Sequence, residues 1–141
     1  MNVIGDRKIV FISWAHVVPR SKGIAEALKA RAFYIEYMKE WPIIVLPIRY
    51  LAQAVRTLAI LRAERPNVVV AMNPPVILPL LTFVYCYFNK ADLVVDSHSG
   101  AFTGAWRRFI TLHRLVSKRA VVTVVTNETL RREVEGREQA R

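Results

Sequence analysis

The chain has 141 residues, which suits one domain with a genuine hydrophobic core and is short for a two-domain enzyme. Its formal net charge of +10 favours partners that carry negative charge, such as phosphates, nucleic acid or anionic lipid. The single cysteine, Cys86, excludes an internal disulfide and a cysteine-rich metal site, and it fits a reducing cytosol.

The apolar fraction of 53% exceeds the usual range for a soluble domain. Either both faces of a sheet are covered and its strands are wholly apolar, or some apolar surface faces a partner or a membrane. The first residues do not have the pattern of a signal peptide. The longest uncharged run, Val76 to Phe88, is shorter than the ~20 residues that span a bilayer, so it predicts a buried or interfacial helix. Extending it back to Val68 would place Asn73-Pro74-Pro75 in mid-span, where a helix breaks.

The first half of the chain alternates apolar runs with amphipathic segments. Arg7 to Ser13 predicts a buried strand, and a helix is expected from about Ser21 to Ala32. Phe33 to Tyr37 is rich in aromatic and β-branched residues and predicts a second strand. A further helix is expected from about Ile48 to Glu64, where apolar residues repeat every three or four positions and Pro66 follows.

The entry to the first helix combines two cations with a glycine, in the order Arg20-Ser21-Lys22-Gly23. Free backbone amides at a helix start, flanked by positive charge, make a candidate anion site. A capped helix with solvated charges is an equally good interpretation.

Two β-branched runs, Val68 to Ala71 and Leu93 to Val95, flank the apolar helix and predict a βαβ unit. In such a crossover the strands are parallel, so Met72-Asn73 and the run Asp96-Ser97-His98 should emerge at the same edge of the sheet. Open α/β sheets bind their ligands at that edge.

The last third of the chain continues the alternation. Ala105 to Arg119 predicts a basic amphipathic helix, whose cations suit anionic headgroups or pyrophosphate, although an ordinary solvated face is an open alternative. Val121 to Val125 predicts the last strand, and Glu128 to Glu135 a helix capped by Thr126 or Asn127. Altogether the pattern predicts one α/β domain over residues 1–135, a Rossmann-like, doubly wound, mostly parallel sheet with helices on both faces, and a frayed tail over residues 136–141.

Asp96 and His98 are the leading site candidates because side chains two positions apart on an extended segment can point the same way. A carboxylate beside an imidazole could accept a hydroxyl proton or bind a sugar hydroxyl. The structural alternative is that Asp96 caps the following turn and His98 bonds to the loop backbone. His16, after the first strand, is a second candidate base, whereas His113 falls on the apolar side of a helix and is expected to be a core or interfacial histidine.

Several common motifs are missing from the chain. No GxGxxG follows the first strand, no GxxxxGK[ST] occurs, and no GxSxG elbow is present, which argues against a dinucleotide cofactor, a P-loop and an α/β-hydrolase site. The three histidines lack metal-ligand spacing, so no metal is expected.

Three runs together resemble a known family: VVVAMNPPVILPLL, LVVDSHSGAF and AVVTVVTNETLRREV. Their order and spacing resemble the N-terminal, acceptor-side domain of GT-B glycosyltransferases, particularly the family 4-like group. The NPP turn followed by Asp-x-His also looks like the β-mannosyltransferases that extend chitobiosyl-diphosphodolichol. The resemblance covers most of the chain.

The resemblance implies transfer of a sugar from a nucleotide sugar, as co-substrate without other cofactors, to an acceptor that is often lipid-linked, at the cytosolic membrane face. It also implies a separate C-terminal domain or subunit that holds the nucleotide sugar, and this chain stops where that domain should begin. A Glu-x7-Glu donor motif is absent, so the chain is expected to be an excised domain or one subunit of a split enzyme, and inactive alone. We assign His98, Asp96 and His16 as candidate catalytic residues, Ser99, Gly100, Asn73, Arg20 and Ser21 as candidate acceptor contacts, and Arg107, Arg108 and Arg114 as candidate membrane or phosphate contacts.

Two other functions stay open at this point. One is a non-catalytic subunit that recruits a separate donor-binding protein to the inner membrane face. The other, ranked last, is a nucleic-acid-binding domain, which the charge suggests but no reading motif supports.

Overall fold

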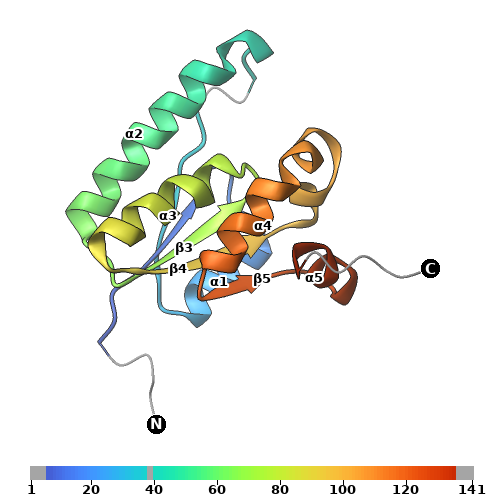
Figure 1. Cartoon of the computed structure of the whole chain (residues 1–141). Helices are drawn as coiled ribbons and strands as arrows, with labels where there is room; N and C mark the ends of the chain where they lie inside the picture. Colours follow the sequence, from blue (N-terminus) through green and yellow to red (C-terminus); the bar gives the residue numbers. More distant parts are fainter. Residues whose placement is uncertain (1–5, 38–39, 136–141) are drawn as a thin grey trace.

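The computed structural model describes residues 6–37 and 40–135, which form a five-stranded parallel sheet with helices on both faces (Figure 1). The strand order is β2-β1-β3-β4-β5, and every neighbouring pair is parallel. The strands are β1 (Ile9–Ser13), β2 (Arg31–Tyr34), β3 (Val68–Asn73), β4 (Asp92–Ser97) and β5 (Val122–Val124). The predicted doubly wound α/β fold is confirmed, and the predicted tail at 136–141 lies outside the described residues.

The helices divide between the two faces of the sheet. The helices are α1 (Pro19–Ala27), α2 (Leu46–Glu64), α3 (Ile77–Asn89), α4 (Ile110–Arg119) and α5 (Glu128–Glu135), with short 3-10 turns η1 (Ile43–Val45), η2 (Ser99–Phe102) and η3 (Gly104–Phe109). Along β1, Val10 and Ile12 pack in the core beneath α2 and α3, while Ile9 and Phe11 pack in the core beneath α1. Both sides of β1 and β3 are therefore covered, which explains why these two strands are apolar up to their last residue.

The first helix and second strand lie earlier than expected. α1 starts at Pro19, a residue suited to the first helical position, and ends at Ala27 instead of Ala32. Lys29 then adopts a left-handed conformation (φ 52°). Arg31 and Ala32, expected in the helix, pair in parallel with Val10 and Phe11 of β1. Pairing with a distant strand therefore outweighs the local helical pattern.

α2 buries two polar residues, Gln53 and Thr57, beside Ile60 and Leu61, and it exposes several apolar residues on its outer side. Thr57 Oγ1 accepts a hydrogen bond from the Trp14 indole at 2.9 Å, and Gln53 Nε2 donates to the Ile35 carbonyl at 2.7 Å. Leu51 and Val55 are instead 66% and 61% exposed. The repeat that predicted this helix thus marks a solvent-facing row.

The basic helix predicted over residues 105–119 begins only at Ile110, so the prediction is wrong for its first third. Gly104 to Phe109 forms the 3-10 turn η3, which Gly104 opens in a left-handed conformation (φ 57°). Phe109 (φ −101°, ψ 16°) then separates η3 from α4. Within α4, His113 and Val116 are buried as expected.

Candidate functional site

The carboxyl ends of β1, β3 and β4 meet at the place where the strand order reverses. The chain moves from β1 to β2 on one side and later returns to place β3 on the other side of β1. In doubly wound sheets this switch point is where ligands bind. Polar side chains from Ser13, Asn73 and Ser97 end the three strands there.

Asp96 is the centre of the polar cluster at this edge. Its side chain is fully buried, and its Oδ1 accepts a hydrogen bond from Arg20 Nη2 at 2.6 Å. Its Oδ2 lies 3.0 Å from His98 Nε2. A buried carboxylate requires such partners, and here each oxygen has one. The alternative in which Asp96 caps the following turn is not what the structure shows, because no backbone amide hydrogen-bonds to it among the described residues.

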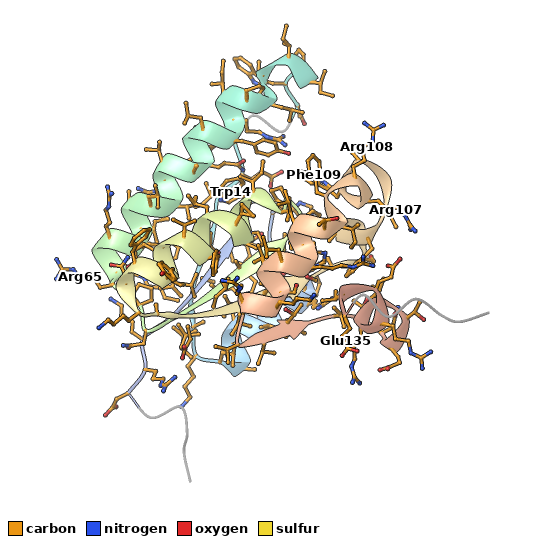
Figure 2. The ribbon with its side chains drawn as sticks, in the orientation of Figure 1. Trp14, Arg65, Arg107, Arg108, Phe109 and Glu135 are labelled. Atoms are coloured by element: carbon orange, nitrogen blue, oxygen red, sulfur yellow. The ribbon has the colours of Figure 1, made fainter. Side chains whose placement is uncertain are left out.

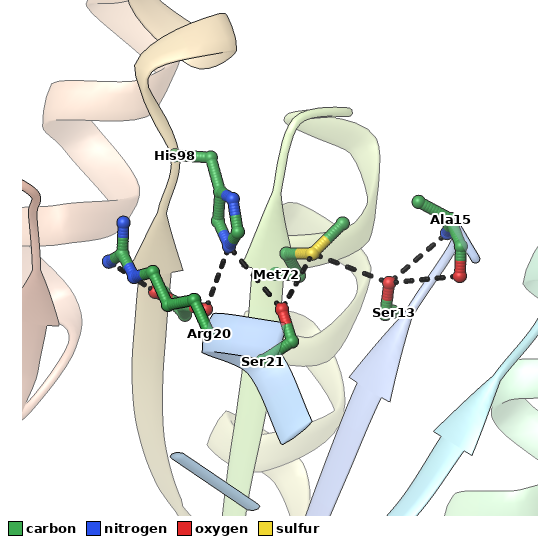
Figure 3. A network of polar contacts seen from close by, with 7 residues as sticks. Ser13, Ala15, Arg20, Ser21, Met72 and His98 are labelled. Atoms are coloured by element: carbon green, nitrogen blue, oxygen red, sulfur yellow. Dashed lines mark hydrogen bonds and ion pairs between the residues drawn. The ribbon is translucent and has the colours of Figure 1, made fainter. Parts of the chain in front are cut away.

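The geometry around His98 sets the position of its proton (Figure 3). Because Nε2 faces the Asp96 carboxylate, Nε2 carries hydrogen and donates to it. In the neutral ring Nδ1 is then the acceptor, and it has no hydrogen-bond partner among residues 6–37 and 40–135. The ring is partly exposed, with 23% of the side chain accessible. This arrangement can accept a proton from a hydroxyl group or bind that hydroxyl.

Two further residues, Ser13 and Met72, join the cluster, although neither was among the candidate site residues. The Met72 sulfur lies 3.4 Å from both Ser13 Oγ and Ser21 Oγ, and Ser21 Oγ is 3.4 Å from His98 Nε2. The Ser13 hydroxyl also accepts a hydrogen bond from the Ala15 amide at 3.1 Å. Ser13 is detectable in principle, because it is the polar residue that ends an otherwise apolar strand. The role of Met72 depends on the strand order, which no local pattern shows.

Arg20 and Ser21 lie at the site, but they contact it through their side chains, which reach Asp96 and His98, and not as the predicted anion site of helix amides. One guanidinium nitrogen of Arg20 is committed to Asp96, and the other, Nη1, is buried without a hydrogen-bond partner in the described part of the chain. Ser21 is fully buried. The amide Nδ2 of Asn73, also buried, likewise lacks a partner there. Unpaired buried donors are rare and suit a site that receives oxygen atoms.

Asn73 does not cap a helix. It is the last residue of β3, its backbone carbonyl accepts the His98 amide at 2.8 Å, and α3 begins only after Val76 without a side-chain cap. Its pairing with Ser97 extends the β3–β4 ladder to the edge of the sheet. Asn73 is therefore held as strand, which accounts for its burial.

The remaining predicted residues at this edge lie around the cluster. His16 is largely exposed, and its Nδ1 lies 3.9 Å from a Glu36 carboxylate oxygen, with no hydrogen bond to Asp96 or His98. Ser99 and Gly100 open η2 directly after His98. A Cβ on Gly100 would meet the Pro74 side chain at 3.6 Å, an ordinary contact distance.

The three arginines predicted to contact a membrane or phosphate differ in their surroundings. Arg107 lies 3.7 Å from the Glu133 carboxylate, and Arg114 Nε donates to the Glu133 carbonyl at 2.8 Å. Both are thus directed towards α5. Figure 2 shows Arg107 and Arg108 pointing outward from η3.

A second serine–histidine pair lies on the other side of β4. Ser97 Oγ is 2.8 Å from His113 Nε2, and the imidazole packs against the Phe102 ring at a centroid distance of 4.8 Å. Burial first, and the neighbouring Arg114 charge second, lower the pKa of His113 to about 4. His113 is therefore a neutral core residue that joins α4 to the end of β4.

The site holds no metal-binding group of side chains. Among the described residues, no three His, Cys, Asp or Glu side chains converge in a way that could hold a metal ion. The chemistry available here is that of one supported imidazole, one buried guanidinium and several hydroxyl and amide groups. Comparison with protein-family models, with curated proteins and with solved structures gave no match to this chain.

Proposed function

We propose that this chain is the acceptor-binding domain of a glycosyltransferase that moves a sugar from a nucleotide sugar to a lipid-linked acceptor at the cytosolic face of a membrane. The observation that carries the proposal is the Arg20–Asp96–His98 chain of contacts at the switch point. His98 Nδ1 accepts the hydrogen bond, and then the proton, of the acceptor hydroxyl, while Asp96 holds the other ring proton on Nε2. The resemblance of the Asp-x-His segment to GT-B acceptor domains supports the same assignment.

The surrounding donors suit the rest of such an acceptor. The Asn73 amide and the second Arg20 nitrogen offer hydrogen bonds to sugar or phosphate oxygens. The nucleotide sugar is held by a separate domain or subunit, so transfer requires both parts. His16, Ser99 and Gly100 complete the edge around this acceptor.

The test is a binding titration of the chain with farnesyl diphosphate linked to N-acetylglucosamine, compared with GDP-mannose and UDP-N-acetylglucosamine. We expect saturable binding of the lipid-linked sugar and none of the nucleotide sugars. His98→Ala should weaken binding by about tenfold, because one hydrogen bond to a charged or polar group is lost. Saturable binding of a nucleotide sugar alone would assign the chain to the donor side, and binding of none of the three would end the proposal.

His16→Ala is the matched control, since it removes the other histidine of the same edge. Equal losses in both variants would place the acceptor hydroxyl between the two rings, whereas loss in His16→Ala alone would transfer the role of base from His98 to His16.

A second function is favoured by one observation. The outward row of α2 leaves large apolar side chains exposed beside cations, which suits a non-catalytic subunit that recruits a donor-binding protein to the membrane. Normal transfer by the complete enzyme with His98→Ala would favour this alternative.

A further inference from the structure

The exposed apolar side chains of this protein concentrate on the helices of one face. On and just before α2 they are Trp41, Ile43, Ile44, Ile48, Leu51 and Val55, with exposures between 61% and 81%. α3 adds Val84, Tyr87 and Phe88, and α4 adds Leu112 and Leu115. These helices cover the same face of the sheet, and α2 extends past its edge (Figure 1). So much exposed apolar surface on one side marks an interaction site.

An apolar groove of about 610 Å³ runs between α2, α3 and η3 on this face. All the side chains that line it are apolar or aromatic, among them Leu46, Tyr50, Leu80, Val84, Trp106 and Phe109. Such a lining offers no polar partner to a sugar or nucleotide and suits a hydrocarbon chain. One end of the groove is formed by Val76 and Ala105, in the segments that leave the carboxyl ends of β3 and β4.

The charge on these elements is almost entirely positive. α2 carries three Lys or Arg residues, η3 two and α4 three, against a single acid on the same elements and α3, Glu64. Glu64 is already neutralised by Lys8 at 2.8 Å and Arg31 at 2.6 Å. Cations around an apolar surface complement anionic headgroups above hydrocarbon. A second copy of this chain would instead bring positive charge against positive charge.

α2 packs against the sheet domain and does not span a bilayer. Ile43–Glu64 is long and apolar enough to span a membrane by length and composition. However, Gln53 and Thr57 tie the inner side of α2 to Ile35 and Trp14, which would be lost if lipid surrounded the helix.

We propose that the face formed by α2, α3, η3 and α4 docks on an anionic bilayer, and that the groove takes one hydrocarbon chain of an anionic lipid. Leu51 and Ile48 enter the headgroup boundary, and the chain lies along the groove against the side chains that α2, α3 and η3 contribute to its lining. This inference rests on the membrane location in the proposed function and names the surface that would provide it. It uses none of the acceptor-site residues, so vesicle binding and acceptor binding can be lost separately.

The first test is co-sedimentation of the full chain with vesicles of phosphatidylcholine and phosphatidylglycerol in equal parts. We expect binding that falls by about tenfold in Ile48→Gln/Leu51→Gln, since two exposed apolar side chains no longer enter the lipid. Val121→Gln/Val122→Gln is the matched control, because both valines are exposed but lie outside α2, α3, η3 and α4, and it should bind normally. Absence of binding, or equal binding by both double variants, would overturn the docking proposal.

The second test addresses the groove with cis-parinaric acid, a fluorescent single-chain anion. Ala105→Trp fills the groove from an exposed position, and Ala27→Trp, exposed at the end of α1, is the control. We expect saturable binding that only Ala105→Trp removes. Unchanged binding in Ala105→Trp would overturn the groove assignment. Concentration-dependent self-association that Ile48→Gln/Leu51→Gln abolishes would make the face an interface between copies and overturn the lipid proposal.

Discussion

Two histidines lie on opposite sides of the end of β4, and their surroundings give them different properties. His98 is partly exposed and contacts a buried carboxylate. His113 is 2% exposed, contacts the Ser97 hydroxyl, and has its pKa lowered to about 4 by burial and by Arg114. Protonation of His113 therefore opposes folding.

His113 should make the protein less stable in mild acid. An unfolded histidine takes up a proton as pH falls through 6.5, but folded His113 does so only near pH 4. Between these values the unfolded state binds more protons, so the free energy of unfolding falls with falling pH, by up to about 3 kcal/mol from this residue. Urea unfolding at a series of pH values from 7 to 4 measures this fall in the free energy of unfolding. The fall should be smaller in His113→Gln and unchanged in His16→Gln. The prediction is refuted if the free energy of unfolding depends on pH in the same way in wild type and His113→Gln.

Burial also controls the chemical reactivity of a single side chain, the thiol of Cys86. Burial in the core, and secondly the Asp92 charge, raise the pKa of its thiol to about 12. The thiolate is the reactive form, so we expect Cys86 to resist iodoacetamide at pH 7.5 in the native protein and to react when unfolded. Rapid labelling of native protein would show that α3 opens from the sheet.

At the scale of elements, α5 depends on a single side-chain cap. Asn127 Oδ1 accepts the Leu130 amide hydrogen at 2.9 Å, which confirms one of the two expected capping residues. Asn127→Ala should lower the free energy of unfolding by about 1 kcal/mol, and Asn127→Ser should restore most of it. Thr126→Ala, the other expected cap, serves as control in the same urea titration. An equal loss in Thr126→Ala would contradict the assignment.

The elements also show what local sequence can predict. Runs of apolar, β-branched or aromatic residues predicted all five strands, most clearly β1 and β3, where both sides of the strand are buried. The α1–β2 boundary was wrong because Arg31 and Ala32 are held by pairing with β1, a contact that local propensity cannot represent. Asp96 and His98 were expected to be neighbours from their spacing, and they are. Their contacts with Arg20 and Ser21, and the place of Met72, follow from the order of strands in space.

For the whole molecule, the sheet order predicts a gradient of local stability. β1, β3 and β4 each have a strand on both sides, whereas β2 and β5 are the edges of the described sheet. Amide hydrogen exchange should therefore be slowest at buried central positions such as Val10, Val70 and Val95, and faster at Val122 to Val124. Equal protection in β5 and β3 would indicate that a partner covers the edge at β5.

The shortness of β5 also bears on how the protein avoids aggregation. A free sheet edge invites strand addition from other chains, and long, flat, apolar edges are the most vulnerable. β5 spans only Val122–Val124, and the adjacent Val121 is 64% exposed. So brief an edge gives an incoming strand few backbone groups to pair with. A protein that carries a large apolar face for another purpose thereby limits uncontrolled growth of its sheet.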